Sequence, residues 1–248
     1  MKILHLYHDI MNLYGEYGNV LLLSHVLNTC GIDTEVILQP LTKKPDFSEV
    51  DFIYMGAGTE ENQRVVLSAL TEVKKELKDY IFKGGYGLWT GNSFEILGKL
   101  LVDAEGKEWK GLEVFSYTVI QQKKNRLTGD AIFTSEKLKE PAVGFINKCS
   151  YIEGVSQPCF TVLMGMGNER EGKTEGIRCE NFTGTHLTGP MLVKNPYFLL
   201  KLVNDLVKKE RNKELSQEEK QALLTGVLAR EAAAYEVTLR ELKKRMEK

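Results

Sequence analysis

The sequence predicts an α/β fold: a flavodoxin-like, doubly wound sheet with extra strands in its second half and a helical C-terminus. Three observations predict it. Strand-like and helix-like segments alternate through the first hundred residues, several short strand-like segments follow between about residues 112 and 186, and helical periodicity returns after residue 196. Such alternation is typical of parallel sheets that carry helices on both faces.

Four strands and three helices are expected in the first hundred residues. The strands are short apolar runs, whereas the helices place apolar residues three or four positions apart, and the first two end at glycine. Thr59 is the expected N-cap of the second helix. The expected strands are Lys2–Tyr7, Thr34–Leu38, Asp51–Tyr54 and Tyr86–Thr90, and the expected helices are Asn19–Cys30, residues 60–81 and Ser93–Leu101.

The second half contains shorter strands and two further helices. The pattern Ser216-x-x-Glu219 indicates a capping box that opens a charged amphipathic helix. We expect residues 1–210 to form one domain and residues 211–248 to form a helical extension. Strands are expected within Glu113–Gln121, Asp130–Thr134, Phe160–Met164 and Gly176–Arg178, and a helix at Pro196–Lys209.

Charge and hydropathy argue against several classes of protein. The chain has 33 basic and 34 acidic residues and a formal net charge of −1, so no basic field predicts a nucleic-acid partner. No apolar run approaches the ~18 residues of a membrane span. The first ten residues indicate a strand and not a signal peptide, so we expect a cytoplasmic protein. The four cysteines lack metal-binding spacing, and no metal or cofactor is expected.

Two loops lie where an open α/β sheet binds ligands, beyond the carboxyl ends of its strands. The first is Gly56-Ala57-Gly58, directly after an expected strand. Its small residues allow a tight turn and can aim backbone amides at a developing oxyanion. The alternative is a glycine-rich turn without a ligand.

The second loop joins the expected strand Tyr86–Thr90 to the next helix. A sharp strand-to-helix turn is a nucleophile elbow when cysteine or serine occupies it. Here the turn residue is Gly91, which we expect to have an unusual or positive φ. Glycine adopts such geometry without strain, but it carries no nucleophile.

Six segments, in chain order, carry a resemblance to a known family. They are similar to motifs of the CobB/CobQ-like class I glutamine amidotransferases. Within that family they most resemble the amidotransferase subunits of lipid II isoglutaminyl synthases, which work with a Mur-ligase-like synthetase. The resemblance spans nearly the whole chain and implies the class I amidotransferase fold. The segments are His8–Asn19, Gly56–Gln63, Gly91–Gly98, Gly144–Lys148, Gly165–Gly176 and Gly184–Pro196.

The same resemblance implies that two catalytic residues are replaced. In the family, a cysteine at the elbow attacks glutamine and a histidine before a Gly-Pro pair acts with it. The shared glycine at position 98 places the cysteine position at Gly91, and the pair Gly189-Pro190 places the histidine position at Thr188. Acyl transfer needs a thiolate and a base within hydrogen-bond reach. Glycine offers no attacking atom, and threonine is not a base near neutral pH. A glutamine-like position of the elbow is also changed, to Glu95.

Other residues are candidates for the lost roles. Ser93 follows the turn by two residues, and its alternative role is that of a helix-start residue. His186 precedes Thr188 by two residues and, in a strand, would share its face; its alternative is a hydrogen-bonded histidine at the rim of the site. Cys159 and Cys179 lie outside any elbow and are expected to be packing residues. The resemblance implies substrate-binding positions at Gly56, Ala57, Gly58, Asn92 and Arg126, the last with a solvated surface arginine as its alternative.

Three functions remain open from the sequence. The first is a non-catalytic amidotransferase-like subunit that binds a Mur-ligase-like or other synthetase. The second is an active amidotransferase or other hydrolase with displaced catalytic residues, such as His186 with Ser93 or Thr90. The third is a module that binds glutamine or another small molecule. We expect the partner to dock over or beside the altered site, because in the family the ammonia made there must reach a synthetase.

Overall fold

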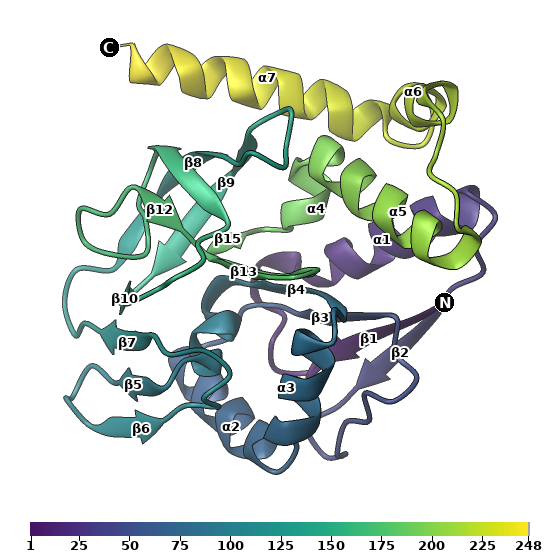
Figure 1. Ribbon diagram of the computed structural model, residues 1–248. Helices are drawn as coiled ribbons and strands as arrows, with labels where there is room; N and C mark the ends of the chain where they lie inside the picture. Colours follow the sequence, from purple (N-terminus) through teal and green to yellow (C-terminus); the bar gives the residue numbers. More distant parts are fainter. Residues whose placement is uncertain (248) are drawn as a thin grey trace.

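Six strands form the central sheet of the computed structural model, which describes residues 1–247 (Figure 1). Their spatial order is β13-β14-β4-β3-β1-β2. All neighbours are parallel except the edge pair β13 and β14. The order β2-β1-β3-β4-β14 is that of a flavodoxin-like sheet, so the predicted doubly wound sheet is confirmed. The strands are β1 (Lys2–Leu6), β2 (Glu35–Gln39), β3 (Phe52–Met55), β4 (Tyr86–Thr90), β13 (Ile177–Cys179) and β14 (Phe182–Thr185).

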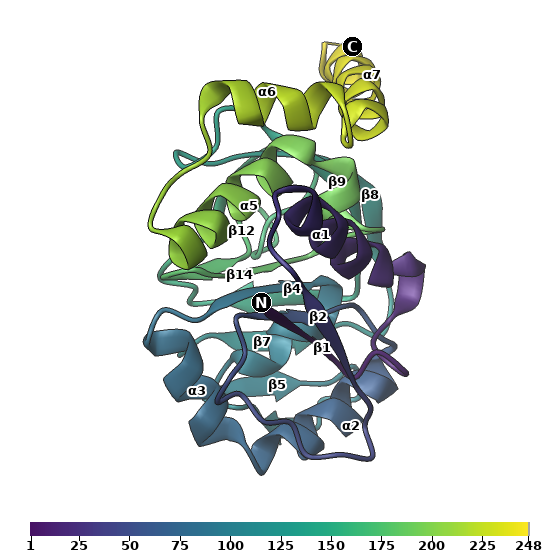
Figure 2. The ribbon, with the colours of Figure 1, turned by 90° about the vertical axis from the view of Figure 1, so that its right-hand side faces the viewer.

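Helices cover both faces of this sheet (Figures 1 and 2). Figure 1 shows α2 (Glu60–Thr71) and α3 (Lys74–Phe82) below the sheet. It shows α1 (Tyr17–Thr29), α4 (Met191–Lys194) and α5 (Pro196–Arg211) above it. Strand β3 contributes Phe52 and Tyr54 to the upper core and Ile53 and Met55 to the lower core. Burial on both faces explains why the strands are continuous apolar runs.

Helix α2 begins as predicted, but the expected helix over residues 60–81 is broken. The Thr59 hydroxyl accepts a hydrogen bond from the Asn62 amide at 3.1 Å. The break falls at Val73, whose backbone (φ −123°, ψ 16°) is not helical. Val73 is buried beside Leu70 and Leu77, so the break keeps the same apolar stripe on the sheet.

The expected helix Ser93–Leu101 is wrong. The chain forms a 3₁₀ helix, η2 (Gly91–Leu97), and then the strand β5 (Leu100–Val102). The carbonyls of Ile96 and Leu97, which an α-helix would bind internally, instead accept backbone amides from the segment 112–115 at 2.8–3.0 Å. Tertiary hydrogen bonds therefore replace the helical ones, and no local apolar pattern reveals such a replacement.

Two further sheets account for the second half of the chain. One has the order β10-β7-β5-β6 and the other the order β12-β11-β8-β9-β15. Strands β7, β8, β11 and β13 lie within or around the four predicted segments, whereas β5, β6, β9, β10, β12, β14 and β15 were not predicted. The remaining bounds are β6 (Glu108–Lys110), β7 (Thr118–Gln121), β8 (Leu127–Thr134), β9 (Ala142–Lys148), β10 (Ser150–Glu153), β11 (Phe160–Met164), β12 (Thr174–Glu175) and β15 (Leu187–Thr188).

The C-terminal extension forms two helices, α6 (Gln217–Thr225) and α7 (Ala229–Met246), interrupted at Gly226. The predicted capping box of Ser216 and Glu219 is present. Helix α7 buries Tyr235, Leu239 and Leu242 against β8 and β9, and the Tyr235 hydroxyl donates to the Pro141 carbonyl at 2.7 Å. The extension therefore packs on its own chain. The proposed division at residues 210 and 211 falls at the last residue of α5.

Residues 1–247 contain neither a membrane-spanning helix nor a metal-binding cluster of side chains. No helix there has the length and apolar character needed to cross a membrane. No group of three histidine, cysteine, aspartate or glutamate side chains is arranged to hold a metal ion within that range.

Candidate functional site

Gly91 lies at the sharp turn where β4 ends and η2 begins. Its φ is +64°, a left-handed conformation that favours glycine. The expected turn geometry is therefore present at this residue, although a 3₁₀ helix follows it. Gly91 is buried, and it lies at the carboxyl end of the central sheet, where ligands of doubly wound folds bind.

Ala57 and Thr188 close around Gly91. A Cβ atom placed on Gly91 would lie 2.5 Å from the Ala57 Cβ and 3.2 Å from the Thr188 Cγ2. Carbon atoms of neighbouring side chains normally lie about 3.5–4.0 Å apart. The fold thus brings together the three segments singled out in the sequence, and the Ala57 methyl group fills the space that a side chain at position 91 needs.

The loop Gly56-Ala57-Gly58 is held by Asn92. The Gly58 amide donates to the Asn92 Oδ1 at 3.1 Å, and the Asn92 Nδ2 donates to the Gly58 carbonyl at 3.0 Å. The Gly58 amide, one of the loop amides proposed as oxyanion donors, is therefore already bonded. Gly56 has no room for a side chain, because a Cβ there would lie 2.6 Å from the Met11 carbonyl oxygen.

A buried carboxylate, Glu16, lies beside the turn. It is fully buried; its Oε2 accepts hydrogen bonds from the Tyr54 and Thr90 hydroxyls at 2.5 Å each. Its Oε1 accepts from the Gly189 amide at 2.8 Å. Burial raises the pKa of Glu16 and these hydrogen bonds oppose the rise. The network fixes the segment before Gly91 to the one after Thr188.

His186 lies in the interior and not at the rim, which corrects one alternative drawn from the sequence. The side chain is 1% exposed. Its Nδ1 lies 3.1 Å from Glu175 Oε1, and its Nε2 lies 3.2 Å from Glu95 Oε1. The ring is held between the buried carboxylates of Glu95 and Glu175. Each carboxylate gains a hydrogen-bond partner, which compensates for its loss of hydration. Neither ring nitrogen is free to act on a ligand.

Glu95 and its neighbours extend this polar cluster. Glu95 Oε2 accepts from the Gln63 Nε2 at 2.7 Å, and its Oε1 accepts from the Ser150 hydroxyl. The nearby Lys148 Nζ donates to the Gly167 carbonyl at 2.6 Å. Burial lowers the pKa of Lys148 to about 8. Glu95, which the resemblance aligns with a glutamine-like position of the elbow, is therefore part of an interior hydrogen-bond network.

Arg126 closes the mouth of the cleft. Its Nη1 lies 2.7 Å from Glu60 Oε1, and its Nε donates to Asn147 Oδ1. The Cys149 thiol donates to the same Glu60 oxygen at 3.3 Å. The cavity that these residues line together with Ala57, Gly58 and Asn92 has a volume of about 10 Å³, which is the room of about one water molecule.

The remaining sequence candidates lie away from the cleft. The Ser93 hydroxyl is buried and donates to the Thr90 carbonyl at 2.7 Å. Cys159 and Cys179 are buried thiols in the two cores. Burial raises the pKa of Cys159 well above its usual value. Both cysteines therefore pack in the interior, as the sequence analysis expected.

Several residues of the site had no sequence prediction, and Glu16, Glu175 and Cys149 are among them. No role was predicted from the sequence for Glu16 or Glu175, although both lie inside segments that resemble the family. The one sequence feature that could have identified Cys149 as a site residue is that it directly follows the segment Gly144–Lys148. Burial, with Glu95 and Glu60 nearby, raises the pKa of Cys149 to about 12. Its sulfur is thus a protonated thiol at neutral pH.

Comparison with known proteins places this chain in a family. Residues 2–196 match the CobB/CobQ-like glutamine amidotransferase domain. The chain is 29% identical over 233 residues to the lipid II isoglutaminyl synthase (glutamine-hydrolyzing) subunit GatD of Streptococcus pneumoniae, covering 93% of this chain and 90% of that protein. It is 32% identical over 195 residues to the GatD subunit of Staphylococcus aureus, covering 79% of each.

Solved structures share the fold at low sequence identity. A glutamine amidotransferase from Thermotoga maritima has a TM-score of 0.52 at 12% identity, covering 99% of this chain and 97% of that one. The glutaminase domain of Trypanosoma brucei CTPS has a TM-score of 0.51 at 10% identity, covering 87% of this chain and 96% of that one. These likenesses support the architecture alone. The domain match over residues 2–196 and the two sequence relatives show that the chain belongs to the CobB/CobQ-like glutamine amidotransferase family.

Proposed function

We propose that this chain is the amidotransferase-like subunit of a lipid II isoglutaminyl synthase-type complex in the cytoplasm and does not itself hydrolyse glutamine. The two GatD relatives support the complex. The contact at the elbow supports the loss of hydrolysis, because the Ala57 Cβ would lie 2.5 Å from a Cβ on Gly91. This contact is the observation on which the proposal rests. Gly91 lacks a nucleophile, and the Ala57 side chain fills the space that a larger residue at position 91 would need.

Amide hydrolysis by this family needs an attacking thiolate, a base and donors for the oxyanion. Gly91 provides no thiolate. The hydroxyl of Thr188 donates to the Phe145 carbonyl at 3.0 Å and is not a base near neutral pH. The Gly58 amide is bonded to Asn92. The nucleophile and the base are therefore missing at their expected positions, and one of the loop amides proposed as oxyanion donors is already bonded.

A displaced active site finds little support. Cys149 is the one thiol lining the described cleft, and its pKa of about 12 leaves it protonated at neutral pH. His186 is bound between two carboxylates, and the Ser93 hydroxyl is turned into the core. A glutamine-binding module is disfavoured in turn, because a cavity of about 10 Å³ holds about one water molecule.

A surface beside the closed cleft fits a protein partner. Its large apolar side chains are 37–57% exposed. Tyr14, in the 3₁₀ helix η1 (Leu13–Gly15), accepts a hydrogen bond at its hydroxyl from the Asn147 Nδ2 at 2.8 Å, which joins this surface to the cleft. Tyr17 and Leu21 are one turn apart on α1 and lie on the same helix face. We call this set the apolar rim: Leu13, Tyr14, Tyr17, Leu21 and Phe145.

The proposed occupant of the apolar rim is a Mur-ligase-like synthetase subunit. Stable protein complexes bury about 1,200–2,000 Å² in total, and an exposed apolar set at the cleft mouth is a suitable centre for such an interface. The partner uses ammonia from solution, since this chain supplies none.

A pull-down with one matched control tests this proposal. Leu21→Glu places a charge in the apolar rim, whereas Leu38→Glu places the same charge at an equally exposed residue, 56% against 57%, on the edge strand β2 and outside the apolar rim. We expect the wild type and Leu38→Glu to recover a synthetase-type partner from the source cell and Leu21→Glu to lose it. Equal recovery by both variants, or a wild-type chain that stays monomeric and recovers no ligase, would contradict the proposal.

A further inference from the structure

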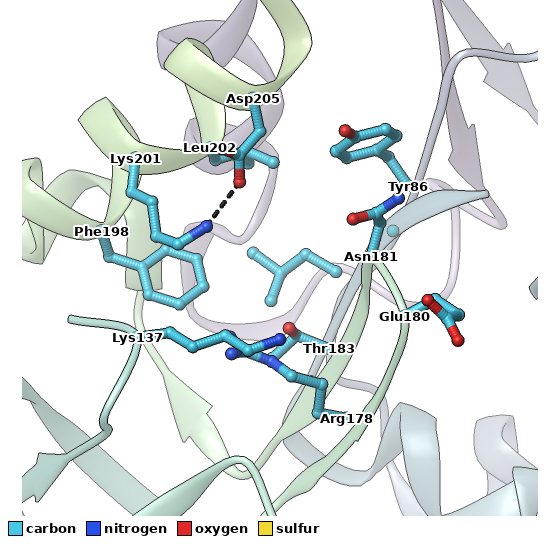
Figure 3. A pocket seen from close by; sticks show the side chains of 12 residues that line it. Tyr86, Lys137, Arg178, Glu180, Asn181, Thr183, Phe198, Lys201, Leu202 and Asp205 are labelled. Atoms are coloured by element: carbon cyan, nitrogen blue, oxygen red, sulfur yellow. Dashed lines mark hydrogen bonds and ion pairs between the residues drawn. The ribbon is translucent and has the colours of Figure 1, made fainter. Parts of the chain in front are cut away.

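A second cavity lies toward the opposite end of strand β4 from Gly91. Figure 3 shows the side chains that line it. Strand β4 separates the two, since Tyr86 lines this cavity and Gly91 follows the last residue of the strand. Five residue steps at about 3.3 Å each place Tyr86 roughly 16 Å from Gly91 along the strand. The volume of this cavity is about 70 Å³, the room of about five water molecules.

The sheet supplies one wall of the cavity. Arg178 of β13 is paired directly with Thr183 of β14, and Thr183 is in turn registered with Leu88 of β4. Residues directly opposite one another on neighbouring strands project from the same face of a sheet. The guanidinium, the hydroxyl and the apolar Leu88 side chain therefore form one row across three strands. Leu88 also belongs to the core cluster that includes Phe198 of α5, so the row faces that helix.

Helix α5 supplies the other wall. Phe198, Lys201, Leu202 and Asp205 line the cavity, and their spacing of three, four and seven residues puts them on one helix face. Lys201 Nζ lies 2.5 Å from Asp205 Oδ2, so these two charges neutralise each other. The floor is apolar, and the α5 wall adds no net charge.

Two further cations converge on the same space without a carboxylate partner among the described residues. Figure 3 shows the Lys137 ammonium, from the turn after β8, beside the Arg178 guanidinium and below the Thr183 hydroxyl. The Glu180 carboxylate, on the same rim, is turned away from them (Figure 3). Like charges held side by side repel unless an anion neutralises them.

We propose that this cavity is a binding site for a phosphate-sized oxyanion. The planar guanidinium of Arg178 offers paired N–H donors that match two oxygens of such a group. Lys137 adds a point charge, and Thr183 adds a hydroxyl donor. The apolar floor of Leu88, Phe198 and Leu202 accepts the carbon portion of a small ester. The site is independent of the amidotransferase cleft, because none of its residues lines that cleft.

Calorimetric titration with inorganic phosphate tests this site, at an ionic strength held constant with sodium chloride. We expect saturable binding of phosphate to the wild-type chain. Arg178→Gln should weaken it by about tenfold or more, because a charge-assisted hydrogen bond contributes at least about 1.4 kcal/mol. Lys137→Gln should weaken it several-fold. Lys139→Gln removes the same charge from an exposed lysine outside the cavity and should leave binding unchanged.

A second titration with phenyl phosphate distinguishes the source of the anion. Binding of inorganic phosphate alone identifies a free-ion site, and tighter binding of phenyl phosphate identifies a site for phosphate esters. Lys137 is exposed, so Lys137→Gln remains informative even if Arg178→Gln does not fold. The proposal is overturned if the wild type shows no saturable binding of either probe, or if Lys137→Gln and Lys139→Gln bind equally well.

Discussion

The Cβ of Ala57 lies 2.5 Å from the position that a Cβ on Gly91 would take. The two residues belong to different loops, at the ends of the neighbouring strands β3 and β4. On the proposed alignment Gly91 occupies the position of the family's cysteine, so restoring the cysteine alone would not restore the site. The Ala57 side chain would also have to move.

Restoring cysteine at the elbow should destabilise the chain, and removing the Ala57 methyl group should relieve part of the loss. Gly91→Cys introduces an overlap that costs about 1–3 kcal/mol, and a side chain at positive φ adds about 1–2 kcal/mol. Ala57→Gly removes the overlap but not the backbone strain. Urea unfolding of the two single variants and the double variant measures the coupling. A cost for Gly91→Cys that is the same with Ala57 and with Gly at position 57 would show that the overlap is absent.

Cys149 should behave as an unreactive thiol. A pKa of about 12 leaves about 10⁻⁴ of the group as thiolate at pH 8, and the thiolate is the reactive form. Labelling with iodoacetamide, followed by mass spectrometry, should be far slower at Cys149 than in the unfolded chain. Glu60→Gln removes one charge that raises this pKa and should speed the labelling. Rapid modification of Cys149 in the folded wild type would revive the displaced-site alternative.

Ionisation of Glu16 should lower the free energy of unfolding as pH rises. Its folded-state pKa is raised by burial, so the folded chain binds this proton more tightly than the unfolded chain. The stabilisation is fully present below the unfolded pKa of about 4.5 and is lost as pH rises through the folded value. Relative to Glu16→Gln, the wild type should therefore lose unfolding free energy as pH rises above about 4.5. Chemical denaturation of both proteins across this range measures the difference, and a difference that stays constant with pH would contradict the argument.

Elements that follow a local pattern could be predicted from the sequence. The strands β1, β3, β4 and β11 and the helices α1 and α5 have clear apolar periodicity and end near their predicted bounds. The segment after Gly91 could not be predicted, because its carbonyls bind the segment 112–115. The breaks at Val73 and Gly226 were missed as well, since the apolar stripe continues across each of them.

The site was predictable in its positions and not in its contacts. Motif spacing identified Gly91, Thr188 and the loop at 56–58, and the fold brings them together. The filling of the space by Ala57 depends on a distance between two loops, which no local pattern encodes. The interior place of His186 likewise depends on Glu95 and Glu175, which are far apart in the sequence from each other.

Ammonia release from glutamine tests the central claim most directly. The purified chain is incubated with excess glutamine, alone and together with its recovered partner, against a heat-killed control. A glutamine-hydrolysing relative such as the Staphylococcus aureus complex serves as the positive control. We predict release no greater than in the heat-killed sample, because no nucleophile stands at Gly91. Release well above that control, abolished by a single substitution in this chain such as Cys149→Ala or His186→Asn, would contradict the account.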